Sequence, residues 1–217
     1  MEKYINKIDK IQELIKDDKI LISIEKLKEL KDEIIYDMAL KNCDSNCKRD
    51  QLKYAKLLLK EAKKDTGRPL IHKMYKIDDT YQILDGFVAV VLKEPISGLE
   101  INTNSEHCFD CRNVINRAGK NYYDYDYNYK KVDIDLLELE QLALKIKKSK
   151  PPYPVETLCH KYNTYYSPLR ILTAIKILGT NNVDIYFHTS SEKDPIYLKS
   201  DLGEAIVLPI TVPKETK

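Results

Sequence analysis

Apolar positions near the N-terminus recur every three or four residues, which is the period of an amphipathic helix. One such run covers residues 2–17, and a second covers residues 23–41 with Ser23 as the expected N-cap. Charged residues fill the remaining positions of both runs, so one side of each helix is suited to water. We expect a helical hairpin that caps a domain or packs against a partner.

A third helical run, over about residues 50–64, carries an apolar line beside a cationic line. The apolar positions are Leu52, Ala55, Leu59 and Ala62, and the cationic positions are Lys53, Lys56, Lys60 and Lys63. Because the lysines are spaced by three, four and three residues, they share one side of the helix. The pattern predicts a helix that packs along one edge and presents a row of ammonium groups along the next. The alternative is a basic face that is only solvated, since exposed lysines are common.

The period then changes to that of short β-strands. Residues 69–77, 80–84 and 87–92 are rich in β-branched and aromatic residues, and Asp85-Gly86 is a strong turn pair. This pattern predicts an antiparallel meander. The stretch of about 96–131 that follows holds a tyrosine-rich tract over 122–129 and is interpreted as an insertion.

The second half of the chain repeats this order of elements. Asp135 with Glu138 predicts the start of a short helix that ends before Pro151-Pro152, and a strand is expected near 157–162. Ser167 and Pro168 predict the start of a further helix that Gly179 closes. Three more strands are expected over 183–188, 195–198 and 204–212. We therefore predict an α+β domain over 48–217, made of two helix-plus-meander halves, after a helical extension over 1–47.

Composition narrows the possible functions. Of the 217 residues, 43% are hydrophobic and 32% are charged, so the chain can bury a core. The chain has only 6 glycines and no GxGxxG or GxxxxGK[ST] motif, which argues against nucleotide binding. It also lacks GxSxG and HExxH, and its histidines lie apart, so we expect no enzyme activity.

The distribution of charge is more informative than the net charge of +2. Residues 48–64 hold seven Lys or Arg against two Asp or Glu, which makes the third helix a local basic feature. No run reaches the roughly 18 apolar residues of a membrane span, and the N-terminus lacks the apolar segment of a secretory signal. We expect a cytoplasmic protein without membrane contact.

Two short motifs contain thiols, Cys43-x3-Cys47 and His107-Cys108-x2-Cys111. Four soft ligands suit a structural zinc, and the candidate ligands are Cys43, Cys47, Cys108 and Cys111. Against zinc, the two motifs are far apart in the sequence, and cytosolic cysteines are mostly reduced and free or form a facultative disulfide. We expect no other cofactor.

The tyrosine tract is suited to stacking on single-stranded bases, but Asp124 and Asp126 within it would repel phosphate, which favours an exposed strand or a recognition loop.

The order of these elements resembles the bacterial DNA polymerase III beta subunit, the sliding clamp. The resemblance covers roughly residues 50–95 and 132–212. In the first part it rests on a basic helix followed by RPLI at 68–71 and ILDG at 83–86. In the second part it rests on YYSPLRILTAIKILG at 165–179, VDIYF at 183–187, DPIYL at 194–198 and AIVLPI at 205–210.

The chain departs from the sliding-clamp family in three respects. It holds one clamp-like domain where a bacterial protomer has three, residues 1–41 have no counterpart, and 96–131 are inserted. A phage- or prophage-type relative fits these departures. Because six domains form the family's ring, encirclement of DNA by this chain would need a homo-oligomer of about six copies.

The resemblance implies a replication accessory, or processivity factor, that binds duplex DNA without sequence preference and docks replication proteins. In the family, cations on the domain helices face the DNA. Here the matching residues are Lys53, Lys56, Lys60, Lys63, Arg170 and Lys176. The family also binds partner peptides in an apolar pocket, which implicates Leu172, Leu208, Pro209 and Ile210; the alternative is an edge strand packed in the core.

Two other functions stay open. The first is a protein-interaction module or regulator that keeps the clamp fold without binding DNA and contacts the host's replication machinery through the N-terminal helices. The second is an enzyme with a cysteine- or zinc-based site in the insertion.

Overall fold

The computed structural model describes residues 2–103, 108–115, 129–148, 158–161, 164–189 and 193–210, except for the side chains of 69, 70 and 161. The chain divides into two compact units, Met1–Asp44 and Ser45–Lys217. No helix in the described ranges has the length and apolar character that crossing a bilayer requires.

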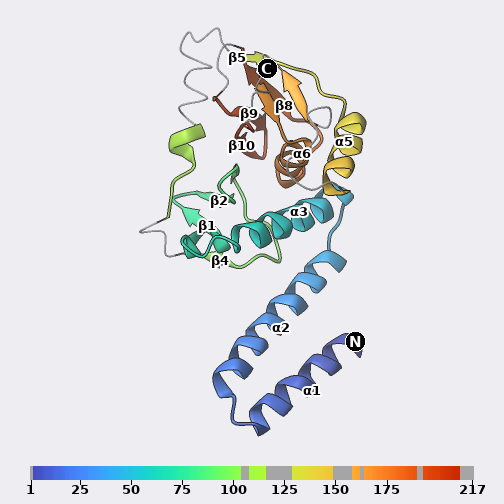
Figure 1. Cartoon of the computed structure of the whole chain (residues 1–217), viewed down its shortest axis with the longest axis vertical. Coiled ribbons are helices and arrows are strands. Elements are labelled where there is room, and N and C mark those ends of the chain that lie inside the picture. Colours follow the sequence, from blue (N-terminus) through green and yellow to red (C-terminus); the bar gives the residue numbers. More distant parts are fainter. Residues whose placement is uncertain are drawn as a thin grey trace, which may run out of the picture. The chain divides into compact units, whose positions relative to one another are not determined.

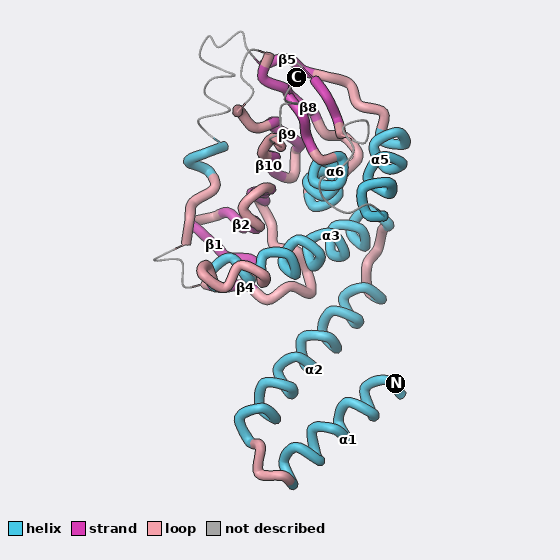
Figure 2. The backbone as a smooth tube through the Cα atoms, in the orientation of Figure 1, coloured by secondary structure: helices cyan, strands magenta, loops and turns pink. Residues whose placement is uncertain are grey.

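The first unit is a helical hairpin of α1 (Glu2–Lys16) and α2 (Ile20–Lys41). The two helices run antiparallel and are joined by a short loop (Figure 2) in which Asp18 has a φ of 59°. The expectation that Ser23 is the N-cap of α2 is wrong. Its Oγ donates to the carbonyl of Lys19 at 2.9 Å inside the helix, because a serine hydroxyl one turn in can bond to the carbonyl four residues earlier.

The second unit begins with α3 (Asn46–Ala62), four residues earlier than its apolar pattern indicated. The Oγ of Ser45 accepts from the backbone N–H of Lys48 at 3.2 Å, so a serine cap sets the start of the helix. The stretch 69–77 was expected to be extended throughout. Instead, Pro69–His72 forms a 3₁₀ turn, since Pro69 presets the φ of a first turn, and only β1 (Met74–Ile77) is a strand.

One eight-stranded sheet organises this unit. The first half of the chain supplies β1, β2 (Thr80–Leu84) and β3 (Val88–Leu92), and the second half supplies β8 (Asp184–His188), β9 (Ile196–Ser200) and β10 (Gly203–Val207). The strand order is β4-β1-β2-β3-β10-β9-β8-β5. The two meanders therefore meet where β3 pairs antiparallel with β10, and each runs outward from this junction.

The predicted helices of the two halves lie on one face of this sheet. α3 packs against β2, and α6 (Pro168–Ile177) packs against β3 and β10, while α3 and α6 also pack against each other (Figure 1). α5 (Leu136–Lys148) packs on α6. Two helix-plus-meander halves thus form a mixed α+β unit, as the sequence predicted.

The caps of the two later helices agree only in part with the sequence. Asp135 Oδ1 accepts from the N–H of Leu137 at 2.8 Å, which confirms the predicted start of α5. Ser167 precedes α6 as expected, but only its carbonyl accepts helix N–H groups and its side chain makes no cap bond.

The opposite face of the sheet is also covered. All five residues of β3 are buried, which indicates packing on both sides of the strand. Cys111 and Ile115, from the region interpreted as an insertion, join a buried cluster with sheet residues such as Tyr75, Tyr197 and Ile206. The same region supplies β4 (Ile101–Asn102) and β5 (Tyr129–Lys131), which extend the sheet at its two ends. Described residues of 96–131 therefore contribute both buried side chains and edge strands to this unit.

Two details near the C-terminus differ from the sequence pattern. The single strand expected near 157–162 is a small two-stranded sheet of β6 (Cys159–Lys161) and β7 (Thr164–Tyr166). β10 ends at Val207, short of the expected 212, because the chain leaves the sheet and Ile210 bridges to Tyr165.

Candidate nucleic-acid interface

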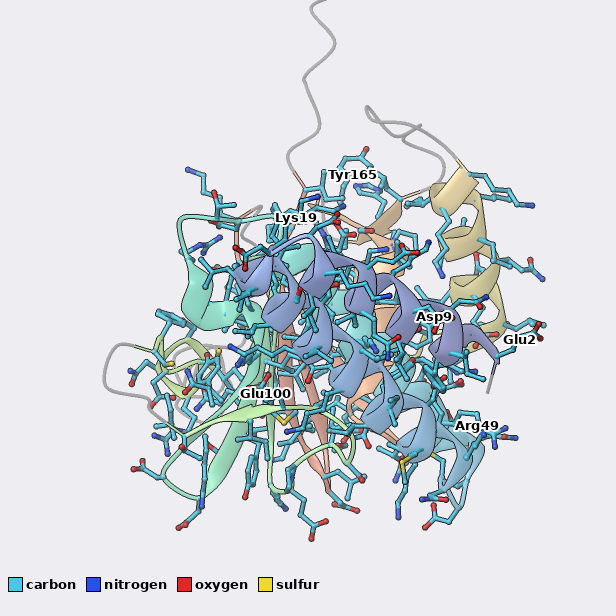
Figure 3. The ribbon with its side chains drawn as sticks, turned by 90° about the horizontal axis from the view of Figure 1, so that it is seen from below. Glu2, Asp9, Lys19, Arg49, Glu100 and Tyr165 are labelled. Atoms are coloured by element: carbon cyan, nitrogen blue, oxygen red, sulfur yellow. The ribbon has the colours of Figure 1, made fainter. Side chains whose placement is uncertain are left out.

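One side of α3 carries a row of cationic side chains. Lys53, Lys60 and Lys63 are exposed and Lys56 is partly buried. Arg49 lies one turn before Lys53, and its side chain extends outward at the start of the helix (Figure 3). We call these five residues the α3 cationic line. The sequence reasoning missed Arg49 as a site residue, although its spacing of four from Lys53 was a sufficient signal.

The acidic side chains of α3 do not interrupt this line. Asp50 lies 3.7 Å from the ammonium of Lys176, and Glu61 lies 2.6 Å from that of Lys64. At about 100° per residue, both carboxylates lie roughly 100–120° around the helix from the centre of the line, beside it rather than within it. Each carboxylate flanks the line and pairs with a lysine outside it, Asp50 with Lys176 and Glu61 with Lys64.

The line is long enough to follow a nucleic-acid backbone. Arg49 and Lys63 are fourteen positions apart, which is about 21 Å along a helix. Phosphates of one DNA strand are spaced by ~3.4 Å along the axis, so the line spans about six of them.

The helix that carries the line is held firmly. Leu52, Ala55, Leu58 and Ala62 are at most 3% exposed and pack into the unit. The side-chain amide of Gln51 donates to the carbonyl of Ile177, at the end of α6, at 2.8 Å. A cationic row on a fixed helix loses less conformational entropy on binding than the same row on a loop.

The two cations predicted on α6 are engaged within the chain. The ammonium of Lys176 lies 3.1 Å from Glu140 and 3.7 Å from Asp50, and the side chain is only 18% exposed. These two carboxylates raise the pKa of Lys176 although its partial burial acts to lower it. The guanidinium of Arg170 lies over the ring of Phe87 at 3.6 Å from the centroid. The structure thus does not place Arg170 and Lys176 with the α3 cationic line.

The residues expected to line a partner pocket are divided between the core and the surface. Leu172 is 3% exposed in α6 and serves the core. Leu208, Pro209 and Ile210 are half-buried just after β10, where Leu208 N–H donates to Phe87 and Ile210 N–H donates to Tyr165, each at 2.8 Å. A hollow of about 250 Å³ lies elsewhere, beside the start of β8, with Val132, Ile134 and Ile175 in its lining.

The candidate zinc ligands are not gathered in the described structure. Among the described residues, no group of three or more His, Cys, Asp or Glu side chains is placed to hold a metal ion. Cys111 is fully buried against the hydroxyl of Tyr75 at 3.3 Å, and burial raises its pKa to about 11. Its thiol therefore packs in the core of the second unit. Cys43 belongs to the first unit and Cys47 to the second, while His107 and the tract 122–128 lie outside the described residues.

Comparison with known proteins adds no assignment: no protein-family model matches the chain, and neither a curated protein nor a solved structure matches it significantly.

Proposed function

We propose that the unit Ser45–Lys217 is a clamp-like, non-enzymatic accessory of DNA replication that binds the backbone of duplex DNA through the α3 cationic line. The observation that carries this proposal is an uninterrupted row of cations on a rigid helix. Such a row attracts phosphates of any sequence, which is the chemistry that a sliding or processivity factor needs.

The architecture supports the clamp-like part of the proposal. Two halves with the same order of elements meet at the β3–β10 pair, and their helices share one face of a continuous sheet. This arrangement is what the sequence resemblance to the sliding clamps implied. One unit of this kind cannot surround a duplex, so topological sliding would need several copies of the chain.

The electrostatic part of the proposal is tested by binding to random duplex DNA. Fluorescence anisotropy with a labelled 30-base-pair duplex is measured over a series of salt concentrations. If the five cations each neutralise about one phosphate, the logarithm of the association constant falls with the logarithm of salt with a slope of about −4.5. Changing Lys53, Lys56, Lys60 and Lys63 to Glu abolishes measurable binding at low salt.

A matched control distinguishes DNA binding through the α3 cationic line from an effect of the protein's net charge. The control variant carries the same change in net charge on exposed lysines elsewhere, namely Lys41, Lys93, Lys130 and Lys148 to Glu. It is expected to bind with nearly the wild-type salt slope. Equal loss in both variants would mean that binding follows net charge, and an absence of binding by the wild-type chain at any salt would overturn the DNA-binding proposal.

The second candidate function is an interaction module that keeps this fold without binding DNA. The observation in its favour is that both cations of α6 make contacts within the chain. As a result α6, unlike α3, has no cationic line. Binding of the wild-type chain to replication proteins but not to DNA would support this function.

A further inference from the structure

The hairpin Met1–Asp44 has an apolar face that its own two helices do not cover. We call it the outer face; its side chains are 42–58% exposed and comprise Ile5, Ile8, Ile15, Ile20, Ile24, Leu27, Ile35 and Met38. Ile11 and Leu30 are 5% and 6% exposed and lie on the side where Lys7 pairs with Glu33. Each helix therefore has two apolar stripes, of which only one faces the other helix of the hairpin.

The angle between the two stripes is that of a helical bundle. With about 100° per residue, the outer stripe of α1 is centred about 70° from Ile11, and that of α2 about 100° from Leu30. Because the helices are antiparallel, both rotations lead to the same side of the hairpin. In a four-helix bundle each helix packs along two such stripes, one for each neighbour. The hairpin thus has the pattern of half a bundle.

The charges beside the outer face identify what completes the bundle. Asp9 and Glu13 border the face on α1; Lys28 borders it on α2, where Lys31 lies within the stripe. In the described part of the chain, no ion pair involves any of these four residues. Lys16 also borders the face on α1, and Asp32 borders it on α2. The α1 edge still carries a net negative charge and the α2 edge a net positive charge, so the face is complementary to itself.

The ion pairs between α1 and α2 show which positions of the two helices lie at the same height. Lys3 pairs with Asp37 and Lys7 pairs with Glu33, so positions of α1 and α2 whose numbers add up to about 40 lie at the same height. If a second copy is related by a two-fold axis parallel to the helices, its α2 lies against α1 with this same register. Asp9 then faces the second copy's Lys31, and Glu13 faces its Lys28.

We propose that a second copy of this chain docks on the outer face, so that two hairpins form an antiparallel four-helix bundle with α1 against the α2 of the other copy. The other two-fold arrangement, α1 against α1, brings Asp9 and Glu13 against their own counterparts. Like charges at such positions oppose pairing, so the charge pattern selects the first arrangement. This inference does not rest on the proposed DNA binding.

The oligomeric state of the full chain tests the proposal. Light scattering after size exclusion is expected to give twice the 25.3 kDa mass of one chain. Ile8→Glu with Leu27→Glu places carboxylates in the contact and is expected to give the mass of one chain, with helix content checked by circular dichroism. A monomeric wild-type chain would overturn the proposal and would leave the face to the chain's own second unit or to a different protein.

A charge reversal tests the arrangement itself. Asp9→Lys with Glu13→Lys is expected to raise the dimer dissociation constant at least about tenfold, because two attractions become repulsions. Adding Lys28→Glu and Lys31→Glu restores dimerisation, since both pairs are then re-formed with opposite sign. Lys10→Glu, on an exposed side of α1 away from this face, is the control and leaves the constant unchanged. If the fourfold variant dimerises no better than the double variant, the α1–α2 arrangement is wrong.

Discussion

Asp110 is the centre of a polar network on the face of the sheet opposite α3 and α6. Its carboxylate accepts from the side chains of Gln82 at 2.9 Å and Arg112 at 2.7 Å, and Arg112 also reaches Asp78. These hydrogen bonds, that of Arg112 first, lower the pKa of Asp110 to about 2. Gln82 is fully buried and also accepts from the backbone N–H of Cys111 at 2.7 Å. One glutamine and one aspartate therefore anchor the segment 108–115 to β2.

This network predicts an acid-sensitive contribution to stability. In the unfolded chain Asp110 has an ordinary pKa of about 3.9. A pKa depressed to about 2 in the folded chain stabilises the fold above that ordinary value, and the contribution is lost as the pH falls from about 5 to about 2. The urea midpoint of unfolding is measured at pH 7 and at pH 2.5. Its fall between the two pH values is expected to be smaller in Asp110→Asn than in the wild type.

Asp201→Asn, in an exposed turn, is the control for this measurement and is expected to show the wild-type pH dependence. An Asp110→Asn variant that loses as much stability on acidification as the wild type would contradict the assignment.

At the scale of elements, the contact between α3 and α6 fixes the position of the cationic line. Gln51 of α3 reaches the carbonyl of Ile177, and Gly179 follows with a φ of +72°. A side chain at Gly179 would place its Cβ 2.7 Å from the amide nitrogen of Gln51. The glycine is therefore required both by its backbone conformation and by the approach of the neighbouring helix.

Gly179→Ala is expected to destabilise the fold by roughly 1–3 kcal/mol, because it strains the backbone and displaces Gln51. Urea unfolding measures the change. Gly67→Ala is the matched control: its Cβ would lie at an ordinary 3.4 Å from Asp65, and its φ is not in the left-handed region. A neutral Gly179→Ala would show that Gln51 does not hold the two helices in register.

At the scale of the whole molecule, the two units differ in how they bury apolar surface. The unit Ser45–Lys217 has its own core, in which β3, β9 and β10 hold fully buried residues such as Val90, Leu198 and Ala205. The hairpin Met1–Asp44 leaves half of its apolar positions exposed. Burial of apolar area is the main favourable contribution to folding, so only the second unit has what independent stability requires.

A chain that begins at Ser45 is therefore expected to fold. Its urea unfolding should remain a single cooperative transition, and its near-ultraviolet circular dichroism should keep the tyrosine signal of the packed core. A truncated chain that lacks a cooperative transition would show that the second unit depends on residues 1–44.

The sequence alone was sufficient for the order of the main helices and of the two meanders. The three- and four-residue spacing predicted α1, α2, α3 and α6, and β-branched runs with turn pairs such as Asp85-Gly86 predicted the two meanders. These features are local, because capping, periodicity and turn chemistry depend on neighbours in the chain. The lysine spacing that defines the candidate interface is equally local, so four of the five cations of the line were found from the sequence. Their binding of DNA remains a prediction.

Only the tertiary structure decided which of these features act together. It joined the meanders at β3 and β10, turned the described part of 96–131 into cover for the second face of the sheet, and engaged Lys176 with Glu140 and Asp50. The sequence determines that Lys176 is charged. Whether its ammonium can bind a ligand depends on Asp50 and Glu140, which are 126 and 36 positions away and which only folding brings within 4 Å. Long-range pairing has no local period, and for that reason no pattern along the chain could have shown it.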